Sequence, residues 1–280
     1  MTNFMNNNSK SLINDLCAKK AQSHKISMIT CYDYPSSVLV QQSQLDFAFV
    51  GDSLGTNVLG YKSEKEVTVD DIVHHTKAVS RGLSSVKLIA DLPYGSYNNE
   101  KDLIYNARRL IQAGATLVKF EGFYPQYVKA LKNNNISVVC HLGLLPQVHE
   151  KKSVQANSYG SAKRLIEQSL DLEKSGACIL VLELVPEEVA QIVSRLLKIP
   201  VIGIAAGRFC DGQVQIWHDV LGLSNKSYKH ITKYEDLNQR CLQSLKKYKQ
   251  DILEDTFLTS QQSFKIDSNI VERLNDVFFN

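Results

Sequence analysis

Short apolar runs recur along this chain with helical-period segments between them, and this repeat constrains the fold more than any other feature. Runs rich in β-branched residues that alternate with helical segments are typical of βαβ units around a buried parallel sheet. The chain has eight such runs, the number that closes a barrel. We therefore predict an α/β protein with a single (β/α)8 TIM-type barrel. The predicted strands are Lys25–Cys31, Phe47–Asp52, Val86–Asp91, Thr116–Glu121, Ile136–His141, Cys178–Glu183, Pro200–Ile204 and Val214–Trp217.

Amphipathic helices are expected between these strands, because apolar positions repeat there with helical period and glycine or proline marks several of the ends. An open, doubly wound sheet would use the same elements. The strand count and the absence of a G-x-G-x-x-G turn favour the closed barrel. The predicted helices are Pro35–Gln44, Asp70–Arg81, Lys101–Ala113, Pro125–Asn133, Ala162–Ser175 and Pro186–Leu197.

The barrel is expected to form one catalytic domain over residues 25–235, preceded by an N-terminal segment at residues 1–24. A length of 280 residues with 44% apolar content allows one domain of this size. After Trp217 the chain becomes polar, with a helix predicted from Asp236 to Asp251 and a looser end from Thr256 to Asn280. We interpret residues 236–280 as a C-terminal helical extension packed on the barrel.

Charge and cysteine content exclude several classes of function. A net charge of only +3, with the basic residues spread along the chain, argues against nucleic-acid binding. The polar, Asn-rich start does not resemble a signal peptide, and no apolar run reaches membrane-spanning length. The six cysteines form no C-x-x-C pair, so neither a zinc site nor a disulfide framework is expected, and Cys31, Cys140 and Cys178 are predicted to be buried thiols. We expect a cytoplasmic protein that acts on small molecules.

Ionisable residues occupy the ends of five predicted strands, directly after runs that must be buried. The carboxyl ends of the strands in a barrel meet at one mouth, where barrel enzymes assemble their active sites. We therefore expect these side chains to converge. They are Asp52, Asp91, Glu121, His141 and Glu183.

Each of these residues also has a purely structural interpretation. Asp52, which is followed by Ser53, could cap a helix, and Asp91 could begin the turn at Leu92-Pro93. His141 could be a histidine at a strand end whose ring is hydrogen-bonded for structural reasons only. However, four carboxylates at one mouth repel one another unless a cation or a basic partner neutralises them. The set as a whole therefore indicates a functional site.

Carboxylate oxygens without thiolates suit a hard divalent ion such as magnesium, which leaves coordination positions for a chelating 2-oxo acid. Lys119 lies two residues before Glu121 and should point to the same side of its strand, where it could bind the substrate carboxylate. Alternatively, Lys119 could pair with Glu121 for structural reasons only. His141 could hydrogen-bond the oxo acid or a metal-bound water.

Long motifs containing these residues resemble the ketopantoate hydroxymethyltransferase family. The resemblance extends from about Lys25 to Tyr234. Its motifs are Thr30–Pro35, Val50–Gly55, Leu59–Tyr61, His75-Thr76, Ala90–Tyr94, Val118–Gly122, His141–Gln147, Leu182-Glu183, Val185-Pro186 and Cys210–Val214.

The resemblance implies a barrel of the phosphoenolpyruvate mutase type and a magnesium ion. It also implies transfer of a hydroxymethyl group from 5,10-methylenetetrahydrofolate to 3-methyl-2-oxobutanoate, which gives 2-dehydropantoate for pantothenate synthesis. Members of the family are typically homodecamers.

The resemblance also assigns roles to individual residues. Asp52 and Asp91 would bind magnesium, and Glu121 would join them directly or through water. Glu183 would be the proton acceptor. The residues that would hold the oxo acid are Asp52, Ser53, Asp91 and Lys119.

Three positions depart from the family pattern. Ala205 interrupts the usual Ile-Gly-Ile-Gly-Ala-Gly stretch, Ala156 replaces the glycine of Lys-Val-Gln-Gly, and Phe123 replaces the second glycine after Glu121. Alanine is restricted where glycine allows a positive φ, so folate binding and loop closure are the properties affected.

Two rival interpretations remain. One is another magnesium-dependent 2-oxo-acid lyase or mutase of the same superfamily, although the sequence has no Lys-Lys-Cys-Gly-His signature. The other is a catalytically silent paralogue that has become a binding or assembly protein.

Overall fold

Eight parallel strands close into a barrel in the order in which they occur along the chain. The computed structural model describes residues 2–149, 151–224 and 228–279. Each strand pairs with its sequence neighbour, and β8 pairs with β1 through Met28 and Val214 to close the ring, so the closed barrel is confirmed over the open sheet. The strands are β1 (Ile26–Thr30), β2 (Phe47–Val50), β3 (Lys87–Asp91), β4 (Leu117–Glu121), β5 (Val138–Gly143), β6 (Ile179–Glu183), β7 (Val201–Ile204) and β8 (Gly212–Gln215).

Two strands are shifted from their predicted positions by two residues. The fifth was expected at Ile136–His141 and lies at Val138–Gly143, and the last was expected at Val214–Trp217 but lies at Gly212–Gln215. Trp217 instead begins the short helix α8 (Trp217–Val220), and its backbone N–H donates to Thr30 Oγ1 at 2.9 Å. The chain therefore turns into a helix directly after the strand.

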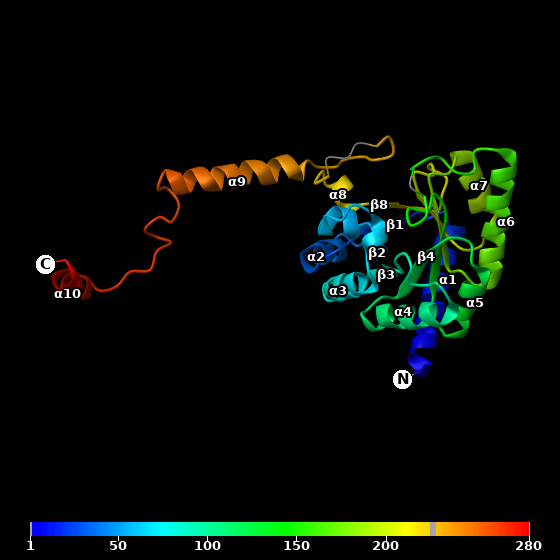
Figure 1. The fold of residues 1–280 in the computed structure, drawn as a ribbon, viewed down its shortest axis with the longest axis horizontal. Coiled ribbons are helices and arrows are strands. Elements are labelled where there is room, and N and C mark those ends of the chain that lie inside the picture. Colours follow the sequence, from blue (N-terminus) through cyan, green and yellow to red (C-terminus); the bar gives the residue numbers. More distant parts are fainter. Residues whose placement is uncertain (1, 150, 225–227, 280) are drawn as a thin grey trace.

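The six predicted helices are confirmed and form the outer layer of the barrel (Figure 1). Their ends are fixed by side-chain caps: Asp33 caps α2, Thr68 caps α3 and Asn99 caps α4. Helix α6 starts three residues before the predicted Ala162, because Ser158 caps it there. The helices are α2 (Tyr34–Gln42), α3 (Val69–Ser80), α4 (Glu100–Gln112), α5 (Pro125–Asn133), α6 (Tyr159–Ser175) and α7 (Glu187–Leu196).

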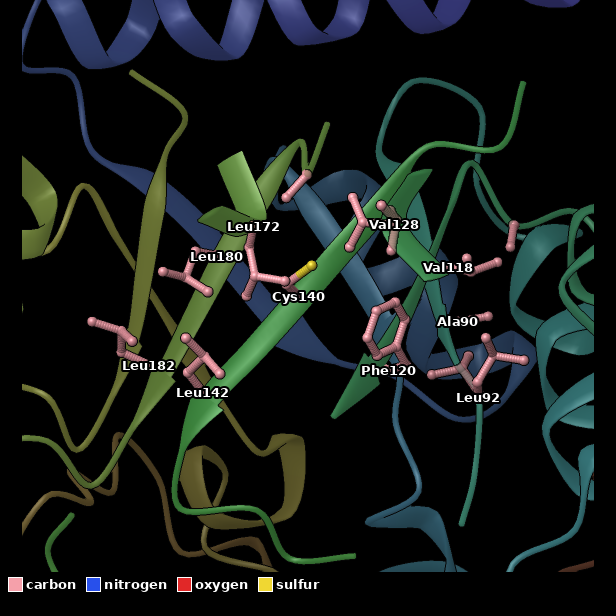
Figure 2. Close-up of a cluster of buried hydrophobic side chains, with 14 of the residues drawn as sticks. Ala90, Leu92, Val118, Phe120, Val128, Cys140, Leu142, Leu172, Leu180 and Leu182 are labelled. Carbon is pink, nitrogen blue, oxygen red and sulfur yellow. The ribbon is translucent and has the colours of Figure 1, made fainter. Parts of the chain in front are cut away.

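Alternation along the strands separates two cores. On β4, Val118 and Phe120 point outward and pack between the strands and the helices, as Figure 2 shows together with neighbouring side chains of β5 and β6. Leu117 belongs to the second cluster, which fills the inside of the barrel. Because side chains alternate with a period of two, Lys119 and Glu121 point inward above Leu117. The alternation of side chains along β4 therefore places apolar groups in the outer core and the charged groups of Lys119 and Glu121 at the barrel mouth.

The N-terminal segment contains a helix that the sequence analysis did not predict, α1 (Thr2–Ala21). Its Leu12 and Leu16 are buried and join the cluster inside the barrel. Lys20 Nζ donates to Ile199 O and to Asp211 Oδ2, both at 2.8 Å. Helix α1 therefore covers the end of the barrel opposite the mouth.

The connection between β2 and α3 carries two further short elements that were not predicted. They are a π-helical turn, η1 (Gly55–Leu59), and a 3-10 turn, η2 (Glu64–Glu66). Ser63 caps η2, and Glu64 reaches the cavity at the barrel mouth. This connection therefore borders the site.

The C-terminal extension does not pack on the barrel, and this expectation is corrected. Helices α9 (Leu237–Leu253) and α10 (Ser268–Phe278) extend away from the rest of the chain (Figure 1), and neither contains a buried residue. α10 also lies within the segment expected to be looser. Apolar side chains of both helices are exposed, among them Leu245 of α9 and Phe278 of α10. Helical periodicity predicts such a helix but not the surface that it contacts.

In the part of the chain that the structure describes, no helix combines the length and the apolar character needed to cross a lipid bilayer.

Candidate active site

The mouth of the barrel contains a cavity of about 90 Å³ at the carboxyl ends of the strands. The ionisable residues predicted to converge all line it, and Ser53 lines it as well. They come from five consecutive strands: Asp52 and Ser53 follow β2, and the others lie in the carboxyl-terminal halves of β3 to β6. The lining groups from β2 to β6 are Asp52, Asp91, Lys119, Glu121, His141 and Glu183.

Lys119 forms a buried ion pair at the floor of this site. Its Nζ donates to both carboxylate oxygens of Asp91, at 3.0 and 2.9 Å, and lies 3.8 Å from Glu121 Oε1. Burial alone would lower the pKa of Lys119, but the surrounding carboxylates, Asp91 first, raise it above its usual value. Lys119 therefore stays positively charged, and its main partner is Asp91 rather than Glu121.

The carboxylates outnumber the positive charge that Lys119 supplies. Burial raises the pKa of Asp52 well above its usual value, and repulsion from Asp91 and Glu121 raises it further. The pKa of Asp91 is also raised by burial, although Lys119 opposes the shift. Such repulsion is relieved by protonation or by an added cation. The site is thus electrostatically prepared for another positive charge.

His141 stands between two carboxylates. Its Nδ1 lies 3.4 Å from Glu121 Oε1, and its Nε2 lies 3.4 Å from Glu183 Oε2. Neither ring nitrogen has a hydrogen-bond partner among the described residues, so the contacts are ion pairs rather than aligned hydrogen bonds. Burial would lower the pKa of His141, but Glu121 and Glu183 outweigh it and raise the pKa to about 9. Burial likewise opposes ionisation of Glu121, yet His141 and Lys119 lower its pKa.

Ser53 is placed by its neighbours. Its Oγ lies 2.9 Å from the hydroxyl of Tyr32, and the backbone O of Tyr32 lies 2.5 Å from His75 Nδ1. Tyr32 is buried. The hydroxyl predicted to contact a substrate therefore rests on a second layer of fixed side chains.

Gln147 is a residue of the site that the sequence analysis did not single out. It is completely buried, and its Nε2 donates to Asp52 Oδ2 at 2.8 Å. Its backbone N–H donates to Glu121 Oε2 at 3.0 Å. The available signal was its position at the end of the His141–Gln147 motif, but one glutamine in a loop carries no periodicity that would reveal its contacts.

The donor set fits a hard ion that retains water. Among the described residues, no group of three His, Cys, Asp or Glu side chains is arranged ready to hold an ion. Magnesium commonly needs only one or two protein carboxylates and keeps several waters. Asp52 and Asp91 are close enough for the backbone N–H of Asp52 to reach Asp91 Oδ2 at 3.4 Å. The chemistry of the site therefore allows magnesium.

The three departures from the family pattern lie near the mouth. Ala156 and Ala205 have φ values of +54° and +53°, in the left-handed region that glycine adopts most readily. Phe123 and Ala156 line a second surface hollow together with Gln155. The two alanines therefore occupy backbone conformations in which an alanine is strained.

A closed barrel with buried carboxylates, a lysine and a histidine at the carboxyl ends of its strands defines a (β/α)8-barrel enzyme. Comparison with known proteins identifies the family. The model of the ketopantoate hydroxymethyltransferase family matches residues 10–259. The chain belongs to this family and is an enzyme of the hydroxymethyltransferase class.

Relatives support the assignment along most of the chain. The 3-methyl-2-oxobutanoate hydroxymethyltransferase of Gluconacetobacter diazotrophicus is 41% identical over 265 residues, which cover 92% of this chain and 96% of the relative. The enzyme of the same name from Halalkalibacterium halodurans is 41% identical over 263 residues, with 91% and 94% covered. Among solved structures, 2,3-dimethylmalate lyase, a member of the PEP mutase/isocitrate lyase superfamily, matches with a TM-score of 0.59 and 14% identity over 91% of each chain. This last likeness shows the shared fold.

Proposed function

We propose that this enzyme transfers a hydroxymethyl group from 5,10-methylenetetrahydrofolate to 3-methyl-2-oxobutanoate, giving 2-dehydropantoate in pantothenate synthesis. The names of the relatives support this substrate. The observation that carries the proposal is one cavity in which Asp52, Asp91 and Glu121 surround Lys119, while Glu183 faces them across His141. Reaction of a 2-oxo acid needs positive charge near the oxygens of the acid and a base near the carbon beside its ketone, and this cavity contains both.

Magnesium is the cofactor in this proposal. Asp52 and Asp91 would bind it, with Glu121 joining directly or through water, and the excess of buried carboxylates supports a cation here. When bound, the ion would stabilise negative charge that develops on the carbonyl oxygen of the substrate.

The remaining steps, binding of the oxo acid and removal of its proton, would be carried out by side chains of the cavity. Lys119 and Ser53 would bind the oxo acid, Lys119 through its positive charge and Ser53 through the hydroxyl that Tyr32 holds in place. Glu183 would accept the proton from the carbon beside the ketone, and His141 would orient it through the contact between Nε2 and Oε2. Water would add to the donor methylene as its two carbon–nitrogen bonds break, which releases tetrahydrofolate and leaves a formaldehyde unit. The deprotonated carbon would bond to the carbon of this unit, and the oxygen of the unit would take up the proton held by Glu183 to become the hydroxyl.

Proton exchange tests the first half of this reaction without the folate. In deuterated water with magnesium, proton NMR should show loss of the C3 proton signal of 3-methyl-2-oxobutanoate, and Glu183→Gln should abolish the exchange. A suitable control is Glu187→Gln, because Glu187 lies at the start of α7 outside the cavity lining. An absence of exchange in the unmodified enzyme would favour the silent paralogue.

Product formation tests the second half. With 5,10-methylenetetrahydrofolate added, 2-dehydropantoate should appear at the expense of 3-methyl-2-oxobutanoate. Exchange without this product would point to another enolate-forming lyase or mutase of the superfamily.

We also propose that the enzyme is a homo-oligomer in the cytoplasm, with a decamer implied by the family resemblance. Apolar side chains of α9, including Leu242, Leu245 and Ile252, are exposed, and so are Leu274 and Phe278 of α10. Packing against another copy of the chain would remove them from water. All six cysteines are free, which suits a reducing compartment.

A further inference from the structure

Gln147 forms hydrogen bonds to two carboxylates of the active site and to the residues around them. Its side chain is fully buried. Nε2 donates to Asp52 Oδ2 at 2.8 Å and to the backbone O of Leu92 at 3.1 Å, and Oε1 accepts from the hydroxyl of Tyr97 at 2.6 Å. The backbone N–H donates to Glu121 Oε2 at 3.0 Å.

These bonds fix which way the amide points. An amide has two N–H donors on one side and an acceptor oxygen on the other. Here both kinds of atom are matched, because the donors face a carboxylate and a carbonyl while the acceptor faces the hydroxyl of Tyr97. If the amide were turned over, its oxygen would face the carboxylate of Asp52. Tyr97 therefore holds Gln147 in the orientation that donates to Asp52.

One residue thus connects carboxylates from two different strands. Asp52 follows β2 and Glu121 ends β4, and Gln147 lies in the loop after β5. The side chain of Gln147 engages one carboxylate oxygen of Asp52, and its main chain engages one of Glu121. Each carboxylate keeps its second oxygen for another partner. Residues that hydrogen-bond ligating carboxylates in this way set ligand orientation and commonly change metal affinity by about 10- to 100-fold when replaced.

We propose that Gln147, locked by Tyr97, is a positioning residue that holds Asp52 and Glu121 in the orientation that binds a divalent cation. The inference rests on the proposed function in one respect, that a hard divalent cation binds between these carboxylates. It adds the residue that arranges them before the cation arrives.

Metal binding without substrate tests this role directly. Mn²⁺ serves as the probe, because its binding to the full-length protein can be followed by electron paramagnetic resonance and by calorimetry. Gln147→Met keeps the length of the side chain and removes the donors, and we expect it to weaken Mn²⁺ binding by about 10- to 100-fold. Tyr97→Phe leaves the amide in place without its lock and should weaken binding less. In turnover, the magnesium concentration for half-maximal rate should rise in both variants more than kcat falls.

A control separates this role from general stability. Leu172 is a fully buried residue of α6 in the core between the helices and the strands, outside the cavity lining. Leu172→Ala leaves a void in this core, so it should lower the melting temperature without changing the affinity for Mn²⁺.

The possible results are distinct. Unchanged Mn²⁺ affinity in folded Gln147→Met or, should that variant not fold, in Tyr97→Phe would overturn the positioning role and leave the proposed function standing. Absence of Mn²⁺ binding to the unmodified enzyme would overturn the metal site of the proposed function, and the positioning role with it.

Discussion

The imidazole of His141 and the carboxylate of Glu183 face each other at the barrel mouth, with Nε2 and Oε2 3.4 Å apart. The other ring nitrogen lies at the same distance from Glu121 Oε1. Two flanking carboxylates outweigh the effect of burial and raise the pKa of His141 to about 9. At neutral pH the ring is therefore a cation that links the base to the carboxylate cluster.

This pKa predicts how stability depends on pH. A group whose pKa is higher in the folded than in the unfolded protein stabilises the fold fully below the unfolded value, here 6.5, and loses this contribution as the pH rises through about 9. In protein freed of metal with EDTA, the free energy of unfolding should fall by up to about 3 kcal/mol across this window. His141→Gln should flatten the decline, as measured by urea denaturation between pH 6 and pH 9 in steps of about half a unit. Equal slopes for both proteins would show that other groups cause the decline.

Lys119 should be the most costly residue of the site to neutralise. Lys119→Met removes the lysine that lies among the buried carboxylates of the cavity. Removing one partner of a buried ion pair lowers the free energy of unfolding by about 3–5 kcal/mol. The cost should shrink at low pH, because the raised pKa values of Asp52 and Asp91 let them become neutral there. Urea denaturation at acid and neutral pH would measure both effects.

An exposed ion pair provides the control for Lys119. Lys163 lies 3.8 Å from Glu167 one turn along α6, and both side chains are largely exposed. Lys163→Met should leave stability unchanged at either pH, because exposed pairs contribute little. A small effect of Lys119→Met at neutral pH would mean that water or protonation already compensates the buried carboxylates.

The sequence was sufficient to predict the strands and the inward-facing charges, because both follow from periodicity, whereas the closed barrel was favoured over an open sheet by the strand count and the absence of a G-x-G-x-x-G turn. On β4, the alternation of Val118, Lys119, Phe120 and Glu121 determines which side chains reach the cavity, and a closed parallel barrel brings all strand ends to one mouth. These inferences need no knowledge of distant contacts.

Contacts made by loops and by isolated helices could not be predicted in the same way. Gln147 lies 95 residues from Asp52 in sequence, and nothing local to either residue specifies the hydrogen bond between them. Helix α1 was not predicted, because its contact with the barrel through the buried side chains of Leu12 and Leu16 is visible only in the structure. The pairing of Lys119 with Asp91 rather than Glu121 also depends on strand register, because β3 places Asp91 directly beside Lys119.

The two alanines with positive φ should be sites where glycine stabilises the protein. An alanine in the left-handed region costs about 1 kcal/mol or more, and glycine removes this strain while adding some entropy to the unfolded chain. Ala156→Gly and Ala205→Gly should each raise the free energy of unfolding by up to about 1 kcal/mol. Ala113, with φ −75° at the end of α4, is the control, and Ala113→Gly should lower stability. Destabilisation by all three changes would show that the loops are not strained.

The exposed apolar face of α9 should be required for assembly of the enzyme. Leu245 is 65% exposed in the single chain, near Leu242 and Ile252 on the same helix. A leucine that becomes buried between two copies contributes about 1.5–3 kcal/mol per site, whereas a charge left there unpaired opposes association. Leu245→Glu should therefore shift the protein toward smaller species in sedimentation velocity, and more strongly on dilution.

Gln243→Glu is the matched control, because it makes the same change of charge at another exposed position of the same helix. It should leave the sedimentation profile unchanged. The barrel of Leu245→Glu should remain folded, because α9 buries no residue against it, and circular dichroism at the transition of the barrel would check this. If Leu245→Glu and the unmodified protein sediment alike at every concentration, then α9 does not mediate self-association, and its apolar face must be explained by a partner other than a second copy of the chain.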